Sequence, residues 1–177
     1  MNTHIVLLIL TISTGASVYW SAPRRTFNQV FAGFAVLSCM WLLNLWLLKL
    51  PDLRDPLPWI RTAAILGTLF PFGVWLLGQS VLLHQQAPLR ELLIQGRWWL
   101  LLSICLAALV MMDGYVLRQD IGQNTNRGRA YVIHVFGLVA YVILLVIDAL
   151  AKAKMKQGPV RHEFLTVILF GATSCLS

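Results

Sequence analysis

Charged side chains are scarce in this chain. Of its 177 residues only 12% are Asp, Glu, Lys or Arg, whereas 58% are hydrophobic. Soluble domains carry roughly a quarter of their residues as charged side chains. So few charges cannot cover the surface of a water-soluble fold of this length. The composition therefore predicts a protein that lies within a membrane.

Residues that carry chemistry are equally few. The cysteines Cys39, Cys105 and Cys175 all fall in apolar stretches and form no C-x-x-C pair, which excludes a disulfide framework, a zinc site and a membrane thiol oxidoreductase. Only His134 lies well inside an apolar stretch, so a pair of axial haem ligands is lacking. No nucleophile with a base and no phosphate-binding loop is found. We therefore expect neither an enzyme nor a cofactor.

Apolar residues are gathered in six long blocks. Each block is near the ~20 residues that a helix needs to cross a hydrocarbon core of about 30 Å. The blocks cover residues 4–20, 27–48, 60–83, 98–117, 130–151 and 163–177. Backbone groups in lipid must be paired internally, so the blocks predict helices. The predicted fold is an all-α polytopic integral membrane helix bundle of about six transmembrane helices, forming one domain because the loops are too short for a soluble one.

The loop charges predict the orientation. No Lys or Arg precedes the first block, whereas Arg24 and Arg25 follow it, which is typical of an uncleaved helix with its N-terminus outside. The inner loops then hold eight Lys and Arg residues and the outer loops six, and the densest group, from Lys152 to Arg161, lies inside. The net charge of +7 is scattered over these loops. It indicates contact with lipid headgroups rather than with nucleic acid.

Aromatic residues near the ends of the blocks resemble interface anchors. Trp20, Trp59 and Trp98 occupy such positions, where an amphipathic ring meets the headgroup region. Trp41 and Trp75 lie deeper in their blocks. They either line a pocket or pack between helices.

Asp113 and His134 are the polar residues within the blocks that suggest a function, because an ionisable group in a membrane is costly. Asp148 has a local explanation, since Lys152 follows it four residues later. Asp113 has none. It lies about five residues before the end of the fourth block, and His134 lies about five residues after the start of the fifth, so antiparallel helices place both roughly 7 to 8 Å below the outer boundary.

Asp113 and His134 would then face each other across a shallow outer cavity beneath Tyr115 and Tyr131. One interpretation is a ligand-binding or proton-sensing pair, since imidazole titrates near physiological pH. The other is an interhelical polar contact that fixes packing and is worth ~1 kcal/mol. The sequence leaves both open.

Three stretches carry a family resemblance. Residues 23–41 follow a short first helix, residues 61–72 contain Pro71 near the centre of a span, and residues 128–141 precede a basic loop and a new apolar run. In this order the chain resembles the N-terminal seven-helix sensor region of bacterial histidine kinases and related signalling proteins. The resemblance covers nearly the whole chain.

The resemblance implies a bacterial cytoplasmic membrane protein of a two-component system, with its N-terminus outside. In that family a seventh helix returns the chain to the cytoplasm, where a kinase, cyclase or phosphatase output is attached. This sequence ends at Ser177, inside the sixth block. The resemblance therefore implies a chain truncated within its sixth helix, with any enzymatic output in a missing C-terminal part.

We expect a membrane sensor or receiver module for signal transduction, without a catalytic output in this chain. Its expected partners are the lipid bilayer and an unidentified small ligand or membrane stimulus, and a homodimer stays open. Two alternatives also stay open. One is a fragment of a small transporter or permease, and the other is a structural or assembly subunit of a membrane complex.

Overall fold

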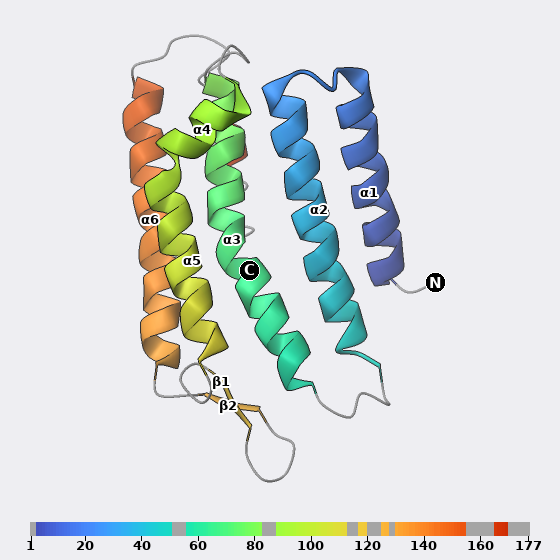
Figure 1. The fold of residues 1–177 in the computed structure, drawn as a ribbon, viewed down its shortest axis with the longest axis vertical. Helices are drawn as coiled ribbons and strands as arrows, with labels where there is room; N and C mark the ends of the chain where they lie inside the picture. Colours follow the sequence, from blue (N-terminus) through green and yellow to red (C-terminus); the bar gives the residue numbers. More distant parts are fainter. Residues whose placement is uncertain are drawn as a thin grey trace.

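The long helices lie side by side along a common axis and alternate in direction (Figure 1). The computed structural model describes residues 3–50, 56–82, 88–112, 117–119, 125–127, 130–154 and 165–169. Its elements are α1 (Thr3–Ser21), α2 (Thr26–Leu47), α3 (Leu57–Leu82), α4 (Leu89–Gln95), α5 (Arg97–Met111), β1 (Leu117–Gln119), β2 (Thr125–Arg127) and α6 (Tyr131–Lys154). Residues 165–169 form a further short helical stretch.

Three of the described helices are long and apolar enough to cross a membrane. These are α2 with 22 residues, α3 with 26 and the part of α6 from Tyr131 to Lys152 with 22. The pair α4 and α5 meets at a 67° bend and adds a fourth span if it crosses as one unit. In α1 the apolar stretch Ile5–Ser21 is shorter. A helical fold with three or four helices apolar enough to span a membrane is thus confirmed in the described ranges, and a membrane bundle of six spans stays a prediction.

α3 lies at the centre of the arrangement, between α2 on one side and α5 and α6 on the other (Figure 1). It contributes more buried side chains than α2 or α5 does. The largest apolar cluster joins α3 to α5, α6 and the short stretch 165–169. Its buried members are Phe72, Val74, Trp75, Leu82, Leu106, Tyr141, Leu145, Ala149 and Ile168.

The structure differs from the elements predicted from the sequence at two places. The fourth predicted helix ends at Met111, and Leu117, predicted as its last residue, instead pairs with Arg127 in an antiparallel hairpin. Apolarity alone does not separate a short helical segment from a strand, which explains this error. The loop predicted after the third span contains α4, a helix of 7 residues that the sequence did not predict.

Exposed basic residues gather at one end of the bundle. Arg24 and Arg25 lie in the connection between α1 and α2, Arg90 lies in α4, and Arg97 begins α5. The α1–α2 connection, α4 and the start of α5 lie at the same end of the bundle as the C-terminal end of α6, which carries Lys152 (Figure 1). The charge count assumed that successive helices run in opposite directions, and the positions of these four residues agree with that assumption. The assignment of this end to the inner side stays a prediction.

At the bend between α4 and α5, Gly96 lies very close to α3. A methyl group placed on Gly96 would lie 2.5 Å from Cζ3 of Trp75 and 3.0 Å from Cε2 of Phe72. Both rings belong to buried side chains of the core. A larger residue at Gly96 would therefore push the α4–α5 junction away from α3.

We predict that Gly96→Ala lowers the free energy of unfolding by about 1 to 3 kcal/mol, the usual cost of overpacking a filled core. Unfolding of the full chain by sodium dodecyl sulfate, followed by circular dichroism, measures this loss. Gly33→Ala is the matched control, since nothing lies within 4 Å of a methyl group there. Equal stability of the two variants would contradict the close approach.

Candidate functional site

The predicted outer site consists of Asp113, Tyr115, Tyr131 and His134, and the structure describes two of these four residues. Asp113 and Tyr115 lie outside the described residues. Tyr131 begins α6 and packs against the small cluster of Val110 and Ala130, which joins the end of α5 to the start of α6. His134 lies in the first turn of α6. The predicted pairing of Asp113 with His134 therefore stays a prediction.

His134 is buried against α5. Its side chain is 7% exposed and its ring lies next to the backbone of Leu106. Helices α5 and α6 are close at this point: a methyl group placed on Gly137 would lie 2.9 Å from Cδ2 of Leu106. Within the described ranges the Nδ1 atom of His134 is buried without a hydrogen-bond partner. An unsatisfied buried polar atom costs about 1 to 3 kcal/mol, so its presence calls for an explanation.

His134 belongs to a regular row of polar side chains on α6. Tyr141 follows it by seven residues and Asp148 follows Tyr141 by seven more. Seven residues are close to two helical turns, so the three side chains lie on one side of α6, about 10 Å apart along its axis. We refer to His134, Tyr141 and Asp148 as the polar row. It runs from the first turn of α6 to a point six residues before the end of the helix.

The middle of the polar row joins α6 to α5. The hydroxyl of Tyr141 donates a hydrogen bond to the carbonyl oxygen of Trp99 at 3.0 Å and accepts one from Oγ of Ser103 at 3.2 Å. The rings of Tyr141 and Trp99 stack at 5.3 Å between centroids and 7° between planes. Tyr141 and Ser103 are both fully buried. This position of α6 is thus fixed by hydrogen bonds and by ring contact.

The far end of the polar row joins α6 to α3. Oδ2 of Asp148 accepts a hydrogen bond from Nζ of Lys152 at 2.7 Å and one from the indole Nε1 of Trp75 at 3.4 Å. Lys152 also lies over the Trp75 ring, 5.4 Å from its centroid. The predicted pair of Asp148 and Lys152 is therefore confirmed. Its third member, Trp75, was predicted only as a residue that lines a pocket or packs between helices.

The polar row contains no constellation suited to a metal ion. Among the residues that the structure describes, no group of three His, Cys, Asp or Glu side chains lies close enough to hold one. Its groups instead make contacts between helices, and these contacts differ along the row. Asp148 and Tyr141 each hydrogen-bond to a neighbouring helix, whereas the buried Nδ1 of His134 has no hydrogen-bond partner among the described residues.

Comparison of the chain with protein-family models, with curated proteins and with solved structures finds no match. The resemblance to the seven-helix sensor region thus stays a prediction.

Tyr141, the middle member of the polar row, was not predicted as a candidate residue from the sequence. A signal was present, because His134, Tyr141 and Asp148 repeat at intervals of seven in a segment that is otherwise almost wholly apolar. Such spacing predicts one common face of a helix. The partners Trp99 and Ser103 are 42 and 38 residues away in the sequence, and no local pattern identifies them.

We predict that Tyr141→Phe lowers the free energy of unfolding by about 1 kcal/mol, the usual worth of a hydrogen bond between membrane helices. The ring contact with Trp99 is kept, so the loss reports the hydroxyl alone. Unfolding in mixed micelles measures it. Tyr19→Phe is the control, because Tyr19 is 42% exposed. A Tyr141→Phe protein as stable as the wild type would show that the hydroxyl contributes nothing.

Proposed function

We propose that the chain is a membrane sensor module in which α6 transmits a stimulus from one end of the bundle to the other. The polar row is the observation that carries this proposal. One end of the row has the unsatisfied Nδ1 of His134, and the other end has the three-membered contact of Asp148, Lys152 and Trp75. One rigid helix therefore bears a group suited to receive a stimulus and a contact suited to report it.

His134 is the proposed receiving group. Among the described residues its buried Nδ1 has no hydrogen-bond partner, an arrangement that a proton or a hydrogen-bonding ligand would improve. A stimulus shifts a protein between two arrangements only when it binds them with different affinity. Here the difference comes from the imidazole, which gains a partner or a charge in one arrangement. Asp113 and Tyr115 belong to this receiving end in the proposal, from their places in the sequence.

The contact of Asp148 with Trp75 is the proposed reporting end. The distance of 3.4 Å between Nε1 and Oδ2 is already long for an N–H···O hydrogen bond. A helix shift of about 1 to 2 Å, as is common in switching bundles, would break it. Lys152 would keep its local bond to Asp148, because both residues are on α6. The two helices would then separate at the end where basic residues gather.

The proposal also includes a location, an orientation and an output for the module. The module lies in a bacterial cytoplasmic membrane with its N-terminus outside, so the basic end faces the cytoplasm. It has no catalytic part of its own and passes its signal to an output domain of a two-component system. The stimulus is a small ligand, a proton or a change in the membrane.

We predict that the environment of Trp75 responds to changes at His134. The full chain, labelled with 5-fluorotryptophan and placed in lipid nanodiscs, gives a ¹⁹F resonance for Trp75 that Trp75→Phe assigns. Imidazole changes its charge between about pH 5 and pH 8, so acidification is a probe that needs no known ligand. The Trp75 resonance should shift on acidification. His134→Gln and Asp113→Asn should each abolish this shift.

The matched control is His84→Gln, which removes another of the four histidines of the chain and should leave the acid response of Trp75 intact. His134→Gln should also move the Trp75 resonance at constant pH. A Trp75 resonance that changes neither on acidification nor in His134→Gln would falsify transmission along α6.

Uptake measurements separate the sensor from the alternatives. A transporter would accumulate a substrate in proteoliposomes, and an assembly subunit would co-purify with a fixed partner. The sensor proposal expects neither result from the purified chain. Substrate uptake that is lost in His134→Gln would assign the polar row to transport instead.

A further inference from the structure

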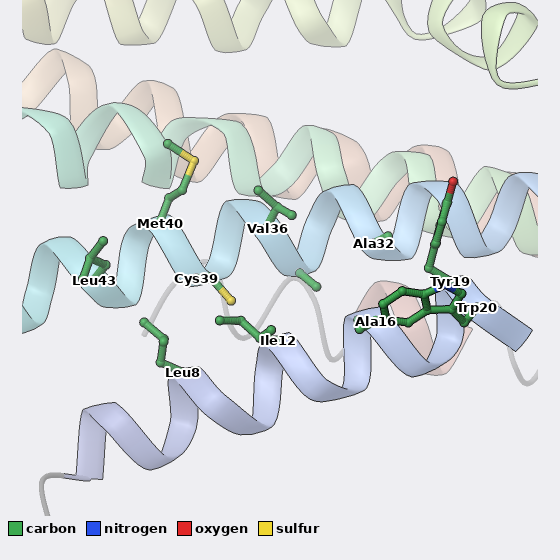
Figure 2. Close-up of a pocket in the computed structure, with 12 residues that line it drawn as sticks. Leu8, Ile12, Ala16, Tyr19, Trp20, Ala32, Val36, Cys39, Met40 and Leu43 are labelled. Carbon is green, nitrogen blue, oxygen red and sulfur yellow. The ribbon is translucent and has the colours of Figure 1, made fainter. Parts of the chain in front are cut away.

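An apolar groove lies between α1 and α2 (Figure 2), on the opposite side of the bundle from α6 (Figure 1). It has a volume of about 640 Å³ and is lined by residues of these two helices alone. Leu8, Ile12 and Ala16 contribute from α1, and Val36 and Met40 contribute from α2. Its walls are almost wholly apolar, so a suitable occupant is an apolar chain rather than a polar metabolite.

Small side chains create the groove. A methyl group placed on Gly15 would lie 2.7 Å from Cβ of Ala35, so the two helices touch at this point. Ala16 and Ala32 flank the contact and fill little of the space beside it. Longer side chains such as Leu8 and Leu43 form the walls toward one end. The result is a narrow trough along the outside of a closely packed helix pair.

The length of the groove matches one leaflet of a bilayer. Its lining on α1 extends from Leu8 to Trp20. These twelve steps along a helix span about 18 Å. One leaflet contributes about half of the ~30 Å hydrocarbon core. The groove is therefore as long as an acyl chain that reaches from the headgroup region toward the bilayer centre.

The two ends of the groove differ in polarity. At one end are Tyr19 and Trp20, and Trp20 is 77% exposed, as is common for a ring at the membrane interface. The connection that follows carries Arg24 and Arg25, both exposed. Guanidinium groups bind phosphate in a bidentate manner. The other end, near Leu8, carries only apolar lining residues.

We propose that this groove binds an anionic phospholipid from the leaflet on the side of Arg24 and Arg25. One acyl chain lies in the trough beside Val36, and the phosphate group binds the two guanidinium groups. The match of groove length to leaflet thickness and the placement of two cations at one end only both favour a lipid over a second copy of the chain. Lipid binding at this groove is independent of signalling along α6.

Native mass spectrometry of the full chain, titrated with phosphatidylglycerol or phosphatidylcholine in detergent, tests the headgroup contact. Phosphatidylglycerol should be retained more strongly than phosphatidylcholine. The double variant Arg24→Gln/Arg25→Gln should weaken the binding of phosphatidylglycerol by about 30-fold, from about 1 kcal/mol for each cation near an anionic headgroup. Arg90→Gln/Arg97→Gln is the matched control, because it removes two exposed cations from the same end of the bundle but away from the groove.

A groove-filling substitution tests the acyl-chain contact. Val36→Trp should weaken phosphatidylglycerol binding by roughly tenfold, equivalent to losing contact with about two methylene groups. Val36 is 59% exposed, so a larger side chain there does not enter the core. Val132→Trp is the control on α6, since Val132 is 58% exposed.

Three results would overturn the assignment. The first is equal retention of the two lipids by the wild type. The second is an equal loss of binding in the groove variants and in their controls. The third is a dimer in the mass spectrum that Val36→Trp dissociates, which would show that a second copy of the chain fills the groove.

Discussion

Trp75 lies where three parts of the bundle meet, and their arrangement depends on its indole. The ring stacks on Phe72 within α3 at 6.3 Å between centroids, and its edge sets how closely the α4–α5 junction approaches at Gly96. Its Nε1 donates to Asp148 of α6, and Lys152 lies over its face. A single side chain that is 3% exposed thus fixes the positions of two neighbouring helices. A smaller apolar residue at this position would lose both contacts at once.

In a lipid environment, polar contacts and close approaches of this kind determine which helices become neighbours. Hydrocarbon tails are as apolar as leucine, so burial of apolar surface does not by itself select which helices become neighbours. In the described ranges the selection is made by polar atoms and by close approaches. Tyr141 does this for α5 and α6, and Gly15 does it for α1 and α2. Asn28 adds a further tie, because its Nδ2 donates to the carbonyl oxygens of Val18 and Ala22 at the end of α1.

The sequence predicted local features of the fold and missed those that depend on helix rotation. Long apolar blocks identified α1, α2, α3 and α6, and the spacing of Asp148 and Lys152 identified an ion pair within one helix. Trp75 could not be assigned to this pair, because it is 73 residues from Asp148. Leu117 was misassigned because an apolar residue suits a strand as well as a helix. Of the predicted outer site, the described residues include only Tyr131 and His134, and their predicted role as a receiving site is untested.

The central helix α3 also bears on how such a bundle is made. Its buried hydroxyls are satisfied within the helix itself, since Thr68 donates to the carbonyl oxygen of Ile65 and Ser80 donates to that of Leu77, both at 2.7 Å. A newly inserted α3 therefore exposes no unpaired hydroxyl at these positions to lipid while α5 and α6 are still being synthesised. Neighbours in the chain, α1 with α2 and α2 with α3, are also neighbours in space. Each of these pairs can therefore form as soon as its second helix has been synthesised.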